Sequence, residues 1–133
     1  MIFIDSNVPM YLVGAAHPHK AEAQLILEGL IAAKRRLVCD AEVLQEILHR
    51  YSAIGRREDI SPALRVLLGI VDEVFPIERQ DVLRASTILD GRDTFSARDA
   101  LHIAVMERHG IEVIFSFDRD YDRWPGLMRI SKV

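Results

Sequence analysis

The sequence predicts an α/β fold in which a mostly parallel sheet of about five strands is covered by helices on both faces. Short apolar segments alternate along the whole chain with longer segments whose apolar residues recur at helical spacing. The short segments are continuously apolar, which is typical of parallel strands buried on both faces. At 133 residues, half of them hydrophobic, the chain has the size of one domain, which we expect to span residues 1–133.

The first half of the chain supplies two strands and three helices. In chain order these are a strand over residues 2–4, a helix over 8–13, a helix over 18–33, a strand over 37–39 and a helix from 40 to 51. Polar residues that favour helix starts follow the first strand, and Pro18 suits the first turn of a helix. Asp40 stands where the N-cap of the third helix belongs.

The second half continues the alternation. In chain order we expect a polar break over residues 52–62, a helix over 64–71, a strand over 73–77, a helix over 81–89, a helix from 96 to 110, a strand over 113–115, a loop over 118–126 and a weak strand over 128–130. Gly110 is a typical helix terminator. The order of elements again favours parallel strands joined by helical crossovers.

Composition and charge limit the functional classes. The formal net charge of −3 argues mildly against a simple nucleic-acid binder, although metal ions bound to acids would weaken that objection. The sequence shows no basic leader and no apolar run of the roughly 18 residues that cross a membrane, so we expect a cytoplasmic protein without membrane contact. The single cysteine, Cys39, suits a reducing compartment and is predicted to be buried.

Acidic residues fall where the ligand site of a parallel sheet is expected, beyond the carboxyl ends of the strands. Asp5 directly follows the first strand, and Asp118 and Asp120 follow the fourth. Glu46 and Asp99 lie in the helices that follow the second strand and precede the fourth. Converging carboxylates repel one another unless cations bind between them, and oxygen ligands favour Mg²⁺ or Mn²⁺. Such ions promote attack of water on a phosphodiester.

Each acid also has a structural alternative. Asp5 could cap the first helix, and Asp99 could form a capping box with Ser96. Glu46 could lie on a solvated helix face beside His49 and Arg50. The acids of the last loop could pair with its arginines.

The histidines and cysteine do not have the spacing of a zinc site, and we find no glycine-rich phosphate loop. His102 lies in an apolar helix and is predicted to be a packed, structural histidine. His17 and His19 are expected at the surface near a turn.

Four segments, in the right order and over nearly the whole chain, resemble the motifs of the PIN-domain family, and in particular VapC-type toxins. They are Ile4-Asp5-Ser6-Asn7-Val8, Val43-Leu44-Gln45-Glu46-Ile47-Leu48, Arg98-Asp99-Ala100-Leu101-His102-Ile103-Ala104 and Phe115-Ser116-Phe117-Asp118-Arg119-Asp120-Tyr121-Asp122. The resemblance implies a three-layer α/β/α sandwich and a Mg²⁺- or Mn²⁺-dependent endoribonuclease. It also implies a homodimer and a type II toxin that a VapB-type antitoxin inhibits.

The matching positions assign the catalytic acids as Asp5, Glu46, Asp99 and Asp118, with Asp120 as a further metal ligand. Two assignments stay open: Glu42 precedes Glu46 by one helical turn, and Asp120 competes with Asp118 for the fourth place. Asn7 and Ser116 are expected to hydrogen-bond around the acids.

An RNA substrate needs cationic side chains beside the acids. The candidates are Lys34-Arg35-Arg36, His49-Arg50, Arg56-Arg57, Arg92 and Arg98. Tyr121 and Trp124 could stack on a base, although packing over the core is the favoured prediction for both. Two rival functions remain: a catalytically inactive PIN-like RNA-binding or regulatory module, and a phosphatase or phospho-acceptor domain that uses Asp5 as nucleophile.

Overall fold

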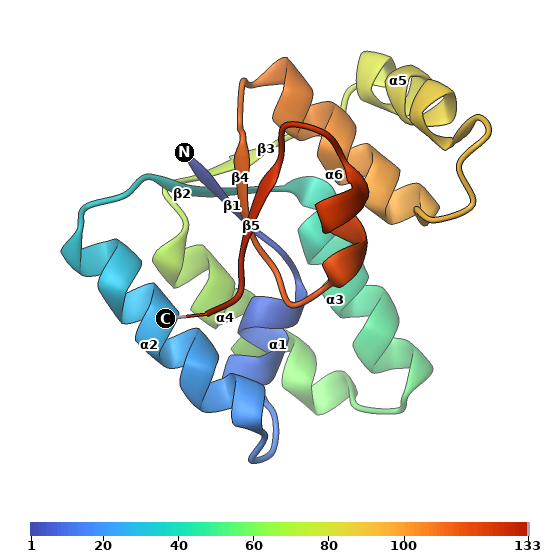
Figure 1. The fold of residues 1–133 in the computed structure, drawn as a ribbon. Coiled ribbons are helices and arrows are strands. Elements are labelled where there is room, and N and C mark those ends of the chain that lie inside the picture. Colours follow the sequence, from blue (N-terminus) through green and yellow to red (C-terminus); the bar gives the residue numbers. More distant parts are fainter. Residues whose placement is uncertain (133) are drawn as a thin grey trace.

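The computed structural model describes residues 1–132, and its central feature is a five-stranded sheet in which every strand pair is parallel (Figure 1). The strand order is β3-β2-β1-β4-β5. The strands are β1 (Ile2–Ile4), β2 (Leu37–Asp40), β3 (Glu73–Phe75), β4 (Val113–Phe115) and β5 (Met128–Ile130). In the centre, Phe3 of β1 lies opposite Val38 of β2 and Ile114 of β4.

Helices cover both faces of the sheet, which confirms the predicted three-layer sandwich. They are α1 (Asn7–Val13), α2 (Pro18–Ala32), α3 (Ala41–Ala53), α4 (Ile60–Ile70), α5 (Arg79–Leu89) and α6 (Ala97–Arg108), with short 3-10 helices η1 (Arg57–Asp59) and η2 (Arg119–Arg123). Figure 1 shows α5 and α6 packed together on one side of the sheet, with α1, α2 and α4 on the other.

The direction of the crossovers reverses once. From β1 the chain moves outward to β2 and β3, then returns through α5 and α6 to β4 on the other side of β1. Because parallel crossovers are right-handed, this reversal puts α5 and α6 on the opposite face. The carboxyl ends of β1 and β4 therefore flank the switch point, where open α/β sheets bind ligands.

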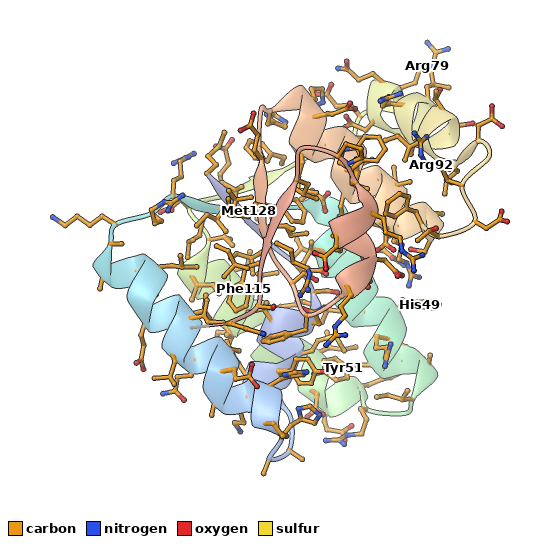
Figure 2. All side chains as sticks on the ribbon, viewed as in Figure 1. His49, Tyr51, Arg79, Arg92, Phe115 and Met128 are labelled. Carbon is orange, nitrogen blue, oxygen red and sulfur yellow. The ribbon has the colours of Figure 1, made fainter. Side chains whose placement is uncertain are left out.

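The core lies on both faces of the three central strands. Every residue of β1 and β2 is buried, including Cys39 as predicted. Phe115 lies inside between the sheet and the helices, whereas Arg79 points outward (Figure 2). This packing fixes the strand ends from which the acidic side chains project.

Several predicted boundaries were wrong, and three of them have a clear local cause. The polar break over 52–62 is shorter, because α4 begins at Ile60 and accommodates Pro62 in its first turn, where a missing N–H costs nothing. β3 ends at Phe75 because Pro76 cannot donate a ladder hydrogen bond. α5 begins at Arg79 rather than at Asp81, since the Asp81 carboxylate accepts a hydrogen bond from the Glu78 N–H and so closes the first turn.

Within the described residues, we find no helix with the length and apolar character needed to span a membrane.

Candidate active site

A cleft of about 560 Å³ opens at the carboxyl edge of the sheet, and all four predicted catalytic acids line it. Asp5 comes from the end of β1, Glu46 from α3, Asp99 from the first turn of α6 and Asp118 from the loop after β4. The fold thus brings together acids that are far apart in the sequence, as the strand–helix alternation predicted.

Asp5 is buried and held on both carboxylate oxygens. Its Oδ1 accepts a hydrogen bond from the Ser6 N–H at 2.8 Å. Its Oδ2 accepts from the Ser116 hydroxyl at 2.5 Å and from the Asn7 amide at 3.3 Å. The Asp5 side chain caps no later residue of α1, so the helix-cap alternative was wrong. Asn7 and Ser116 surround the acid as predicted.

Burial gives Asp5 unusual electrostatics for a carboxyl group. Loss of hydration, opposed by nearby His102 and reinforced by Glu46, raises the pKa of Asp5 to about 6. The hydrogen bonds from Ser116 and Ser6 act in the opposite direction and favour the charged form. Asp5 is therefore a carboxyl group whose charged form gains from an added positive charge.

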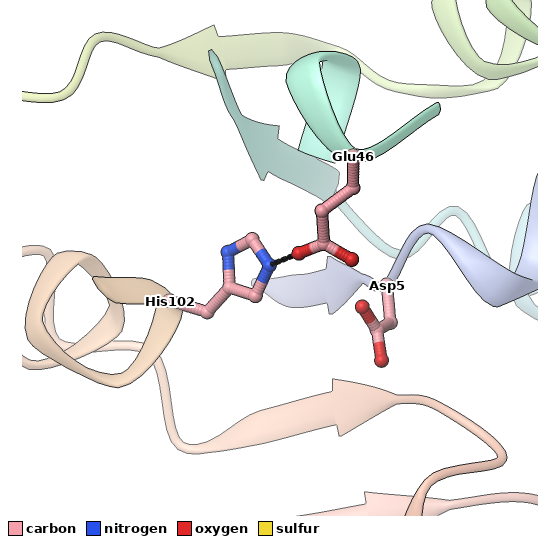
Figure 3. A group of neighbouring side chains, drawn as sticks. All are labelled: Asp5, Glu46 and His102. Atoms are coloured by element: carbon pink, nitrogen blue, oxygen red, sulfur yellow. Dashed lines mark hydrogen bonds and ion pairs between the residues drawn. The ribbon is translucent and has the colours of Figure 1, made fainter. Parts of the chain in front are cut away.

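Glu46 is fixed by two neighbours, of which Figure 3 shows His102. The Ser6 hydroxyl donates to Glu46 Oε2 at 2.8 Å, and Nε2 of His102 lies 2.5 Å from Oε1. The other ring nitrogen of His102, Nδ1, lies 2.8 Å from Oδ2 of Asp40. His102 is buried, as predicted, and connects the acid that ends β2 to the acid on α3.

Charge pairing decides how these groups titrate. Burial by itself would raise the pKa of Glu46, but the hydrogen bond and positive charge of His102 lower it. Burial likewise disfavours the charged form of His102, yet the carboxylates of Asp40 and Glu46 raise its pKa well above the ordinary value. Glu42, the alternative to Glu46, does not line the cleft and pairs with Arg98 instead, at 3.4 Å.

Asp99 combines its structural role with a place in the cleft. Its Oδ2 accepts from the Ser96 N–H at 3.3 Å, and its own N–H donates to the Ser96 hydroxyl, so the capping box is present. Its Oδ1 accepts from the hydroxyl of the fully buried Tyr121 at 3.1 Å. Burial and the neighbouring Asp118 raise the pKa of Asp99.

Asp118 and Asp120 both lie beside Asp99, so the two rival positions are neighbours. Oxygens of Asp99, Asp118 and Asp120 lie within 4.8 Å of one another. A second group with the same spacing consists of Asp5, Glu46 and His102. Asp118 lines the cleft, and its Oδ1 accepts from the Asp120 N–H at 2.9 Å. The site therefore has two acidic halves within one cleft.

Basic side chains also line the cleft, but only some of the predicted ones. Arg50, Arg56 and Arg98 contribute to its lining. Arg56 pairs with Asp59 at 2.6 Å and Arg98 with Glu42, whereas the guanidinium of Arg50 has no carboxylate partner within residues 1–132. Lys34-Arg35-Arg36 precede β2 and lie at the opposite edge of the sheet, because the cleft is at the carboxyl ends of the strands.

The predicted stacking role of the last loop is not available to Tyr121, whose ring is fully buried. Trp124 packs against the core, makes an edge contact with Phe95 and carries the Arg92 guanidinium 5.3 Å from its ring centre. Both rings close over the core, as the favoured prediction stated. Arg92 lies in the loop between α5 and α6 (Figure 2).

Sequence reasoning missed three residues that hold the site in place: Ser6 and Tyr121, which hydrogen-bond to the acids, and Asp40, which contacts His102. Asp40 carried a usable signal, because it ends β2 at the same sheet edge as Asp5. His102 follows Asp99 by three residues and so shares its helix face, which was also readable. Tyr121 gave no such signal, since a loop tyrosine has no preferred direction in the sequence.

A parallel five-stranded sheet with four acids at its switch point defines a class of protein, an α/β domain with a carboxylate site. The model of the PIN domain family matches residues 2–127, and the chain belongs to this family.

Close relatives carry the same name as the toxins that the motifs resemble. Ribonuclease VapC13 of Mycobacterium tuberculosis is 59% identical over 131 residues, which are 98% of this chain and 100% of the relative. Ribonuclease VapC23 of the same species is 40% identical over 118 residues, 89% of this chain and 93% of the relative.

Solved structures of such toxins share the fold. The crystal structure of Mycobacterium tuberculosis VapC20, described as a sarcin-ricin loop cleaving toxin, superposes with a TM-score of 0.75 at 24% identity, covering 92% of this chain and 93% of that chain. VapBC2 from Rickettsia felis, bound to a promoter DNA fragment, gives a TM-score of 0.75 at 17% identity, covering 100% of both chains.

Proposed function

We propose that this protein is a metal-dependent endoribonuclease that cleaves RNA phosphodiesters as the toxin of a type II toxin–antitoxin pair. The observation that carries the proposal is the convergence of Asp5, Glu46, Asp99 and Asp118 on one cleft. The 59% identity to a VapC ribonuclease over 98% of the chain supports the assignment of the reaction.

The residues present fit a hard divalent cation, Mg²⁺ or Mn²⁺. Within each acidic half the ligand atoms lie within 4.8 Å of one another, and the half with Asp5 and Glu46 includes His102, which is already engaged on both nitrogens. Oxygen donors of this kind suit Mg²⁺ and Mn²⁺. Asp5, Glu46, Asp99 and Asp118 would hold the ion, with Asp120 as a further ligand. A bound ion supplies activation of water and charge neutralisation at the phosphate.

The remaining work falls to side chains that orient the acids and the RNA. Ser6, Ser116 and His102 fix the direction of the Asp5 and Glu46 carboxylates through hydrogen bonds. Arg50 lies one helical turn beyond Glu46 on α3 and lines the same cleft. Its guanidinium has no carboxylate partner in the described part of the chain and would bind a substrate phosphate.

The direct test is cleavage of a labelled single-stranded RNA by purified protein in Mg²⁺, in Mn²⁺ and in EDTA. We expect cleavage with either cation and none with EDTA. Asp5→Asn and Asp99→Asn should each reduce the cleavage rate by about 100-fold or more. Mutation of a residue that only hydrogen-bonds to a metal ligand already lowers metal affinity or activity by about 10- to 100-fold. Asp93→Asn, in an exposed position before α6, is the matched control and should cleave normally.

Full activity of both cleft variants would reject the carboxylate mechanism. A well-folded protein that binds RNA but neither cleaves it nor binds Mg²⁺ or Mn²⁺ by calorimetry would favour the inactive RNA-binding module instead. The phospho-acceptor alternative is disfavoured because both oxygens of Asp5 accept hydrogen bonds, and because no lysine lines the cleft among the described residues.

The proposed partners are a VapB-type antitoxin and a second copy of the chain, with action in the cytoplasm. Several structural neighbours are solved as toxin–antitoxin complexes, including one from Klebsiella pneumoniae. Co-expression with the product of the neighbouring reading frame, followed by size-exclusion chromatography, tests both partners. A monomer that forms no complex would contradict this part of the proposal.

A further inference from the structure

Four ring side chains form a cluster that reaches the acid-lined cleft. Tyr11 of α1 stacks on His17 with ring centres 4.8 Å apart and an angle of 29°. His19 stacks on Phe117 at 4.3 Å and 22°. Tyr11 joins the two pairs through an edge contact with Phe117 at 5.3 Å. Of these rings, Tyr11 and His17 line the cleft itself.

The ring of His17 is exposed and yet held in place. It stands at the N-cap of α2, where its Nδ1 accepts a hydrogen bond from the His19 N–H at 3.1 Å. This bond and the stacking on Tyr11 fix the ring orientation from two directions. A ring already ordered in the free protein loses little conformational entropy when a ligand stacks on it.

The cluster is tied to the acids by short connections. Phe117 directly precedes Asp118, and its N–H donates to Oδ1 of Asn7 at 3.4 Å. The amide nitrogen of Asn7 in turn donates to Asp5. Tyr11 lies one helical turn after Asn7 on α1. The rings therefore have a fixed position relative to the carboxylates.

We propose that Tyr11 and His17 form a stacking platform for one unpaired RNA base next to the scissile phosphate. This inference rests on the proposed ribonuclease function and adds to it a binding position for one base beside the acids. Any base offers a π face to an aromatic ring, but only an unpaired base is free to leave its own stack.

The charges of the cleft agree with this arrangement. Arg50 lines the same cleft with no carboxylate partner within residues 1–132, and is placed to bind a phosphate of the same strand. The cleft thus offers three kinds of group: acids that would hold the cation at the scissile phosphate, a guanidinium for a neighbouring phosphate, and the rings of Tyr11 and His17 for a base.

A double-mutant cycle between protein and RNA tests the platform. The substrates are a short single-stranded RNA with one cleavage site and the same RNA with single abasic residues at each position around that site. The proteins are wild type, His17→Ala and Tyr11→Leu, and the readout is kcat/KM in Mg²⁺. Leu25→Ala is the control, because Leu25 is exposed on α2, the helix that His17 caps, and does not line the cleft.

We expect His17→Ala and Tyr11→Leu to reduce kcat/KM on the intact RNA by about 5-fold or more, the usual effect of losing one stacked base. At one abasic position kcat/KM of the wild-type protein should fall by a similar factor. On that abasic RNA, kcat/KM of the two variants should equal that of the wild type, because the base that stacks on the rings is already missing. Equal effects of the variants on intact and abasic RNA would overturn the platform. Equally fast wild-type cleavage of the same RNA annealed to its full complement would also overturn it. Wild type that leaves the intact RNA uncut would instead reject the ribonuclease proposal itself.

Discussion

Nε2 of His102 lies 2.5 Å from Oε1 of Glu46, and this contact joins α6 to α3 inside the protein. Since the other ring nitrogen contacts the buried carboxylate of Asp40, one imidazole balances two acids. His102 therefore acts on the site through the position of Glu46.

His102→Ala should lower the free energy of unfolding and raise the Mg²⁺ concentration that cleavage requires. Removal of one partner of a buried ion pair leaves the other without compensation, so we expect the free energy of unfolding to fall by about 3–5 kcal/mol. Below the melting temperature, the Mg²⁺ concentration for half-maximal cleavage should rise about 10- to 100-fold. Urea unfolding and Mg²⁺ titrations measure the two effects, with His49→Ala as the exposed control. An unchanged Mg²⁺ dependence would show that His102 has only a structural role.

Glu46→Gln and Glu42→Gln separate the two candidate acids of α3. Glu46 lines the cleft and contacts His102, whereas Glu42 does not line the cleft and pairs with Arg98. Glu46→Gln should therefore lower kcat/KM by about 10- to 100-fold, and Glu42→Gln by no more than about 3-fold. Steady-state cleavage of the same RNA by both variants gives the comparison. The reverse order of effects would assign the metal role to Glu42.

Arg50→Ala and Arg35→Ala test where RNA binds. Each phosphate contact to a single strand contributes about 0.7 to the slope of log affinity against log salt concentration. Arg50→Ala should lower the slope by about that amount, because Arg50 lines the cleft. Arg35→Ala should leave it unchanged, since Arg35 lies at the opposite edge of the sheet. The measurement is RNA binding by fluorescence anisotropy over a series of salt concentrations. A change of slope for Arg35→Ala alone would show that the RNA binds away from the cleft.

Asp81 makes the stability of the α5–α6 layer pH-dependent. Arg108 donates two hydrogen bonds to the buried Asp81, at 2.8 and 2.9 Å. Burial would raise the pKa of Asp81, but these bonds and the Glu78 N–H lower it below its ordinary value. The stabilisation is therefore complete above the unfolded pKa of about 3.9 and is lost as pH falls through the lower folded pKa.

Asp81→Asn should accordingly lower the free energy of unfolding by about 1.5–3 kcal/mol near pH 6. The difference from wild type should shrink as the solution is acidified toward the folded pKa, as urea unfolding at several pH values would show. Glu107→Gln is the control, because it breaks the exposed pair with Arg84 between the same helices and should cost less than about 1 kcal/mol. A pH-independent difference for Asp81→Asn would contradict the argument.

Parts of this molecule were predictable because their causes are local. The strand Val113–Phe115 has the predicted bounds, since a continuous apolar run between polar residues has few other structures. The capping box of Ser96 and Asp99 is equally local and is present. The start of α4 was missed because Pro62 is a helix breaker in general and a tolerated residue in a first turn.

The order of apolar and polar segments along the chain was enough to predict the alternation of strands and helices, and with it the sheet edge at which Asp5, Glu46, Asp99 and Asp118 gather. The neighbours that hold these acids could be identified only in the folded protein, because side-chain direction depends on packing between segments remote in sequence. In the fold Glu46 rather than Glu42 contacts His102, the Tyr121 hydroxyl donates to Asp99, and Arg50 lines the cleft with no carboxylate partner within residues 1–132. The positions of the acids relative to the strand ends predicted that they lie at one edge of the sheet. The same positions could not predict which residues hydrogen-bond to them.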